Sequence, residues 1–116
     1  MEWLDGIAGA IVVCDTQGII LYLNRQAEIN FAGEGGAALI GSNLLDCHPE
    51  PSRSKLRELL AEQKTNVYTI EKRGIKKLIW QKPWYRDGVF AGLVEFSLEI
   101  PREMPHFVRS AAAEPV

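Results

Sequence analysis

The sequence predicts one α+β domain, and the order of its segments is the reason. A pair of short, β-branched apolar segments comes first, at residues 10–14 and 19–23. Brief helical segments follow, centred on residues 44–49, and three further β-rich segments end at residues 89–96. Strands grouped at both ends of a chain, with helices between the groups, are typical of an α+β domain.

The length of 116 residues and the composition fit a single domain with its own core. Hydrophobic residues make up 47% and charged residues 24%, close to a globular average, so disorder is not expected over most of the chain. We expect a leading helix or cap over residues 1–9, the domain over 10–100, and an extended, flexible tail over the proline-containing residues 101–116.

Charge, cysteine content and hydropathy exclude several classes of protein. The net charge is −2 and the basic residues are scattered, so the electrostatic footprint of a nucleic-acid-binding protein is absent. Two cysteines are too few for the disulfide framework of a small secreted domain. The first residues carry no export signal, and the longest apolar run is far below the ~20 residues of a membrane span. These patterns predict a cytoplasmic protein without a membrane or nucleic-acid partner.

The first two strands are predicted to form a hairpin, since the turn-rich residues 15–18 separate them. Asn24 follows the second strand and is a good N-cap for a helix over residues 25–32, because its side chain can accept from a free N–H of the first turn. The glycine-rich residues 33–36 lack the ending of a phosphate loop and follow a helix, so we interpret them as a flexible connection.

A clearer helix is predicted after Pro49 and Pro51, because proline is tolerated in a first helical turn. Its buried stripe is Leu56, Leu59 and Leu60, at i, i+3 and i+4.

The last half of the chain is predicted to be an antiparallel meander with a defined register. Asp87-Gly88 is a strong hairpin signal that pairs Tyr85 with Phe90, and uninterrupted pairing then sets Gln81 opposite Val94. The predicted core face carries Ile79, Gln81, Tyr85, Phe90, Val94, Phe96 and Leu98, joined by Tyr68 and Ile70 through a turn at Arg73-Gly74. The predicted outer face carries Leu78, Trp80, Lys82, Trp84, Leu93, Glu95, Ser97 and Glu99.

Several stretches resemble PAS domains, a family of small sensor folds. Residues 11–20 are similar to the family's first hairpin, Asn24 to its helix-starting asparagine, residues 39–41 to the step before its central helices, and residues 86–92 to its last turn and strand. The resemblance covers about residues 5 to 100. The Cys47-His48-Pro49 step and residues 99–107 look like those of small bacterial PAS proteins.

The resemblance implies a five-stranded antiparallel sheet with short helices packed on one face, a ligand cavity in some members, and frequent dimerisation. It argues against two cofactor types. Nothing here matches the reactive-cysteine string of the flavin-binding light sensors. The axial-histidine position of the oxygen-sensing haem kinases aligns with Leu56, which cannot ligate iron. The resemblance therefore names no cofactor.

Two polar positions are the best candidates for chemistry. Gln81 is a lone amide on the predicted core face and needs a partner, either another protein group or a ligand. His48 beside Cys47 offers imidazole and thiolate, but two ligands are too few for a closed zinc site, and a structural role that caps the backbone near Pro49 is the alternative. The candidate ligand-binding residues are Gln81, His48, Cys47, Tyr68, Leu56 and Phe96.

Two tryptophans fall on the predicted outer face, where a monomer would leave a large apolar patch in water. Such a patch indicates an interface, so we predict a homodimer. The alternative is that the leading segment with Trp3 folds back over the tryptophans. The candidate interface residues are Trp80, Trp84, Leu93, Leu78 and Trp3.

Taken together, the residues and the resemblance predict a non-enzymatic sensor or interaction module of bacterial signal transduction, with a signalling partner protein or a fused output domain. No nucleophile–base pair with an orienting acid is evident. A haem or metal sensor that uses His48 and a ligand-free structural adaptor are the alternatives.

Overall fold

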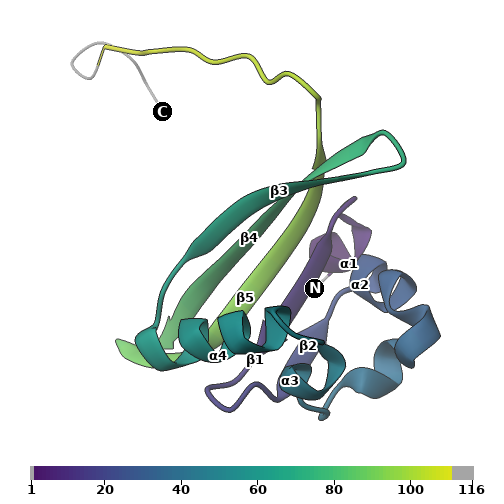
Figure 1. Cartoon of the computed structure of the whole chain (residues 1–116), viewed down its shortest axis with the longest axis vertical. Helices are drawn as coiled ribbons and strands as arrows, with labels where there is room; N and C mark the ends of the chain where they lie inside the picture. Colours follow the sequence, from purple (N-terminus) through teal and green to yellow (C-terminus); the bar gives the residue numbers. More distant parts are fainter. Residues whose placement is uncertain (1, 111–116) are drawn as a thin grey trace.

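A computed structural model describes residues 2–110 of the chain, and its elements follow the predicted order (Figure 1). The elements are α1 (Glu2–Gly6), β1 (Ala10–Cys14), β2 (Ile20–Leu23), α2 (Arg25–Asn30), the 3-10 helices η1 (Ala32–Glu34) and η2 (Gly36–Leu39), α3 (Leu44–Cys47), α4 (Ser52–Glu62), β3 (Asn66–Lys72), β4 (Ile75–Arg86) and β5 (Val89–Ile100). The glycine-rich residues 33–36 are therefore part of two short 3-10 turns rather than a loose connection.

The five strands form one antiparallel sheet in the order β2-β1-β5-β4-β3. The first and last strands of the chain are thus neighbours in the interior of the sheet, where β1 pairs with β5. The short helices α2, α3 and α4 lie along one side of the sheet, and the β3–β4 hairpin extends beyond them (Figure 1). The predicted fold class, an antiparallel sheet with short helices on one face, is confirmed.

Asn24 caps α2 as predicted, and it also ties three segments together. Its Oδ1 accepts from the backbone N–H of Ala27 at 3.0 Å and of Ile11 at 2.9 Å. Its Nδ2 donates to the carbonyls of Leu4 and Gly9, each at 2.8 Å. The side chain is fully buried, and these four bonds use all of the hydrogen-bonding capacity of the amide.

The core lies between the sheet and the helices. Leu56 and Leu59, two of the three residues predicted to form the buried stripe of α4, are 6% and 1% exposed. They pack with Cys14 and Leu93. Leu93 is only 4% exposed, so the prediction that it lies on the outer face is wrong.

The register of β4 against β5 departs from the prediction after one pair. Tyr85 opposes Phe90 as expected, but a bulge follows and Trp84 opposes Gly92 instead of Ala91. Every later pair is shifted by one residue, so that Gln81 opposes Glu95 and Trp80 opposes Phe96.

Gly92 gives the physical reason for this bulge. Its φ of +143° is a conformation that side-chain-bearing residues rarely adopt, and a Cβ on it would lie 1.9 Å from the carbonyl oxygen of Cys14. Because side chains alternate along a strand, one extra residue turns β5 over. Leu93 and Glu95 face the helices, whereas Val94, Phe96 and Leu98, which we predicted in the core, share the outer face with Trp80.

The β3–β4 hairpin has the predicted register, with Tyr68 opposite Ile79 and Val67 opposite Trp80.

The beginning of the predicted tail, residues 101–110, has no helix or strand and is exposed. Arg102 still contacts the hairpin, since its guanidinium lies 3.3 Å from the Glu71 carboxylate and its carbonyl accepts from the Lys76 ammonium at 3.2 Å. The rest of the predicted tail, residues 111–116, lies outside the described residues.

Within residues 2–110 no helix is both long and apolar enough to cross a membrane.

Candidate functional site

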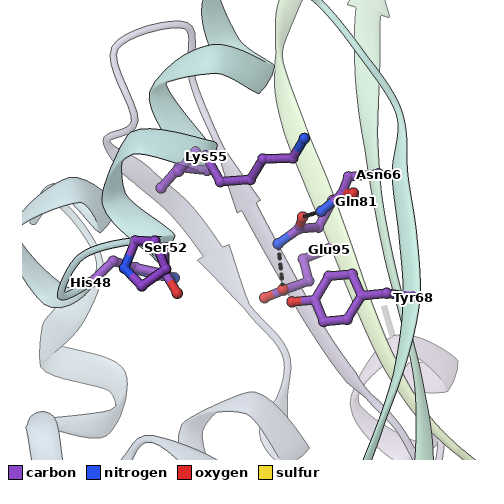
Figure 2. A pocket seen from close by; sticks show the side chains of 9 residues that line it. His48, Ser52, Lys55, Asn66, Tyr68, Gln81 and Glu95 are labelled. Atoms are coloured by element: carbon purple, nitrogen blue, oxygen red, sulfur yellow. Dashed lines mark hydrogen bonds between the residues drawn. The ribbon is translucent and has the colours of Figure 1, made fainter.

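A hollow lies between α4 and strands β3, β4 and β5, on the helix-covered side of the sheet (Figure 2). Its volume is about 560 Å³. It is lined by His48, Pro51, Ser52, Lys55, Leu56, Asn66, Tyr68, Gln81 and Glu95. We call it the Glu95 pocket.

A chain of amides and a carboxyl group forms the sheet wall of this pocket. Asn66 on β3 donates through Nδ2 to Gln81 Oε1 at 2.8 Å, and Gln81 Nε2 donates to Glu95 Oε1 at 2.9 Å. Figure 2 shows the Tyr68 hydroxyl close to the same carboxyl group. Since the amide oxygen of Gln81 is engaged by Asn66, its NH₂ group is held toward Glu95.

Glu95 is the electrostatic centre of the wall. Burial raises the pKa of its carboxyl group, while the Gln81 hydrogen bond and the nearby His48 act in the opposite direction. The pKa of Tyr68 is also raised, by burial and then by the charge of Glu95. Among residues 2–110, no lysine, arginine or histidine forms an ion pair with Glu95.

His48 and Ser52 lie on the opposite, helical side of the pocket (Figure 2). The imidazole Nδ1–H of His48 donates to the carbonyl of Leu44 at 2.7 Å, which leaves Nε2 as its other hydrogen-bonding atom. The backbone carbonyl of His48 accepts from Arg53 Nε at 3.0 Å. His48 therefore bonds the backbone, but at Leu44 of α3 rather than beside Pro49 as predicted, and it also borders the Glu95 pocket.

Cys47 points elsewhere. It borders a second, smaller cavity of about 110 Å³ between β1, β2 and the helices, which His48 also lines. Its thiol lies 3.7 Å from the carbonyl oxygen of Asn43. The other cysteine, Cys14, is fully buried, and this burial raises the pKa of its thiol, so it is an inert core residue.

Four of the six predicted ligand-binding candidates meet at the Glu95 pocket: Gln81, His48, Tyr68 and Leu56. Cys47 lies outside it. Phe96 also lies outside it, because the Gly92 bulge turns Phe96 to the outer face, where it is 37% exposed. Sequence reasoning missed Glu95 and Asn66. The glycine within the last strand was the available signal, since a glycine there often marks a bulge that shifts the register.

The outer face of the sheet is apolar around one aromatic pair. Trp80 is 40% exposed and pairs with Phe96 on one side and Val67 on the other. Leu78 and Leu98 form the next pair along the same face. We call these five residues the outer patch.

Two other predicted interface residues are placed differently. The half-buried Trp84 donates through Nε1 to the carbonyl of Cys14 at 3.0 Å, so its indole is held within the chain. Trp3 lies on α1 and is 63% exposed. This helix contacts the β1–β2 side of the sheet, where the Tyr22 hydroxyl donates to Asp5 Oδ1 at 3.2 Å. The predicted fold-back of this segment over the tryptophans is not observed among residues 2–110, because Trp80 stays open to solvent.

Comparison with known proteins agrees with this geometry. A family model described as PAS fold matches residues 4–68, which is more than half of the chain. The chain belongs to the PAS fold family. PAS domains are typically sensory and non-catalytic modules. No curated protein matches this PAS domain at a significant level.

Solved structures of other PAS domains share its fold. The PAS domain of BvgS from Bordetella pertussis is 18% identical with a TM-score of 0.63, over 87% of this chain and 83% of that chain. A sensory box sensor histidine kinase from Vibrio cholerae is 17% identical with a TM-score of 0.62, over 86% and 88%. The Aer2 receptor from Vibrio cholerae, described as a dual PAS-haem oxygen sensor, is 20% identical with a TM-score of 0.58, over 83% and 97%. At these identities the likeness establishes the PAS fold and nothing finer.

Proposed function

We propose that this PAS domain is a non-enzymatic, homodimeric sensor that binds a small molecule in the Glu95 pocket and passes the signal to a partner protein or a fused output domain. The observation that carries the proposal is the polar wall. Asn66, Gln81 and Glu95 are aligned by hydrogen bonds at the side of an apolar core, which favours the recognition of a ligand.

The arrangement suits binding better than catalysis. The pocket holds a carboxyl group and an imidazole, but its polar groups are hydrogen-bonded to the protein: Gln81 to Asn66 and Glu95, and His48 Nδ1 to a backbone carbonyl. No group of three or more His, Cys, Asp or Glu side chains close enough to hold a metal ion occurs within residues 2–110.

Filling the pocket tests the binding function. Ser52→Trp places a large side chain at the pocket rim, whereas Ser54→Trp changes the same residue type in the same helix outside the pocket. We expect a ligand retained by the native protein, detected by native mass spectrometry, to be lost from Ser52→Trp and kept by Ser54→Trp. Equal retention by both variants would place the ligand elsewhere. A ligand-free native protein whose stability no small-molecule library changes would support the structural-adaptor alternative.

A haem sensor is the second candidate, because His48 Nε2 is available as an axial ligand once Nδ1 is bonded to Leu44. Two observations argue against it. Leu56, at the position where haem kinases carry their axial histidine, is buried in the core, and the polar wall would face an apolar macrocycle. A Soret band in the absorption spectrum of the purified protein, lost in His48→Ala, would establish the haem sensor instead.

Dimerisation is proposed through the outer patch. Trp80, Phe96 and Val67 are 40%, 37% and 49% exposed and lie next to one another across three strands, so they form a contiguous apolar surface. Aromatic residues at the centre of such a patch are typical of interfaces between subunits. A second copy of this face provides the matching apolar surface.

A further inference from the structure

The Glu95 pocket carries a charge that the described chain does not balance. The Glu95 carboxyl group is partly buried at the pocket wall, and the described residues give it one hydrogen bond, from Gln81 Nε2 to Oε1 at 2.9 Å. A carboxylate offers about four acceptor sites. A carboxylate that is partly withdrawn from water, with a single donor and no paired cation, is destabilised, which favours the uptake of a proton or the binding of a cation.

The surrounding side chains do not supply that cation. The ammonium of Lys55, at the pocket rim, lies 3.0 Å from the Glu58 carboxylate and is half exposed. His48 is near enough to act on the pKa of Glu95 but forms no ion pair with it, and its Nδ1–H is directed to Leu44. From β3 and β4 the carboxyl group is faced by the neutral groups Tyr68 and Gln81.

We propose that the ligand of this pocket carries a cationic nitrogen, an ammonium or amidinium group, that Glu95 binds as a carboxylate. This inference rests on the proposed ligand-binding function of the pocket. The ligand nitrogen donates to the free acceptor sites of Glu95, and the Tyr68 ring and hydroxyl flank it. The apolar part of the ligand lies toward Leu56 and Pro51, which line the same pocket.

The orientation of Gln81 supports this charge. Asn66 holds the amide so that its NH₂ group, and not its oxygen, faces Glu95. A donor at that point stabilises the ionised carboxylate, because hydrogen bonds to a charged form favour that form. The wall is therefore built to keep Glu95 negative once a cation enters, and a ligand with a carboxylate or phosphate in that place would be repelled.

Matched probe molecules test the proposal. Three scaffolds, benzyl, cyclohexylmethyl and butyl, are each titrated as the amine, the alcohol and the carboxylate at pH 7.5, with the ¹H–¹⁵N spectrum of the whole chain and the side-chain NH₂ signals of Gln81 and Asn66 as the readout. We expect the amines to bind at least about tenfold more tightly than the corresponding alcohols, a difference of about 1.4 kcal/mol. Glu95→Gln should reduce this preference to about twofold or less while the spectrum stays that of a folded protein.

The outcomes separate this inference from the function on which it rests. Alcohols that bind as tightly as amines, with shifts at Gln81, would overturn the cationic ligand and leave the pocket as a binding site. A preference for amines that persists in Glu95→Gln would also overturn it, because the charge recognised would not be Glu95. The binding function fails together with the inference if no probe shifts the pocket signals of the native chain and if Ser52→Trp retains the native ligand as well as Ser54→Trp does.

Discussion

Trp80 and Phe96 lie directly opposite each other on β4 and β5, and both point to the face of the sheet that is turned away from α4. Two aromatic side chains that lie directly opposite each other on neighbouring antiparallel strands pack against each other and stabilise the sheet. Each residue nevertheless keeps more than a third of its surface open to solvent, so the pair forms the centre of the outer patch. The two residues can therefore be replaced without opening the core.

Trp80→Glu and Phe96→Glu, made singly, are each expected to give a folded monomer in analytical ultracentrifugation, because a charge at the centre of an apolar interface is left unpaired on association. Val89→Glu is the control, since Val89 is 68% exposed at the β4–β5 turn, outside the patch, and it should leave the dimer intact. A native chain that is monomeric at all concentrations would contradict the proposed dimer. An unfolded Phe96→Glu would contradict the register.

Trp84 is expected to behave unlike Trp80. Its indole N–H donates to the Cys14 carbonyl, so Trp84→Phe removes that hydrogen bond and should lower the free energy of unfolding by about 1 kcal/mol. Trp3→Phe, at a residue that is 63% exposed, is the control and should change it by less than about 0.5 kcal/mol. Urea denaturation measures both. Equal effects at the two positions would mean that the Trp84 hydrogen bond adds nothing to stability.

Gly92→Ala tests the bulge. The new Cβ would overlap the Cys14 carbonyl oxygen and occupy a strained φ, so we expect a loss of about 2 to 4 kcal/mol in the free energy of unfolding. Gly88→Ala separates the two causes, because Gly88 also has a positive φ, +80°, but nothing within 4 Å of its added Cβ. That variant should lose about 1 to 2 kcal/mol from backbone strain alone. Similar losses at both glycines would show that the close approach to β1 is relieved at little cost.

The pH dependence of stability is expected to carry the signature of Glu95. Its pKa is raised in the folded state, so the folded protein binds more protons than the unfolded chain above the ordinary glutamate pKa of about 4.3. The contribution of Glu95 to the free energy of unfolding is therefore fully present below that pH, and it is lost as the pH rises through the folded-state pKa.

Glu95→Gln keeps the shape of the side chain and removes the titration. The difference in urea midpoint between the native protein and this variant, measured from pH 4 upward, should turn progressively against the native protein as the pH increases. A difference that is constant with pH, or that moves in favour of the native protein, would mean that the folded state holds Glu95 ionised without a penalty.

The parts of the fold that follow from local signals could be predicted from the sequence. Asp87-Gly88 and Arg73-Gly74 set the two hairpin turns, so the alternation along β3 and β4 placed Gln81 and Tyr68 correctly on the helix-covered side. Asn24 was identified as an N-cap because its side chain has a local partner, Ala27, three residues on.

Glu95 could not be placed by the same reasoning. The face of each β5 residue depends on a single inserted residue at the bulge, and a one-residue slip reverses every side chain beyond it. The bulge lies where Gly92 of β5 comes close to Cys14 of β1, and this is a contact between distant parts of the chain. The predicted register therefore placed Glu95, the polar partner of Gln81, on the outer face of the sheet. That Gln81 needs a partner could be predicted from its position alone.

The buried amide of Asn24 has a mechanical consequence for α1. One of its donors is satisfied by the Leu4 carbonyl on that helix, while the other three bonds go to Gly9 just before β1, to Ile11 of β1 and to Ala27 of α2. A shift of α1 by a single residue would move the Leu4 carbonyl out of reach. One N–H of the buried Asn24 amide would then have no acceptor, at a cost of about 1 to 3 kcal/mol. Displacement of α1 from this position is thus penalised, so one buried amide fixes the register in which the helix docks beside β1 and α2.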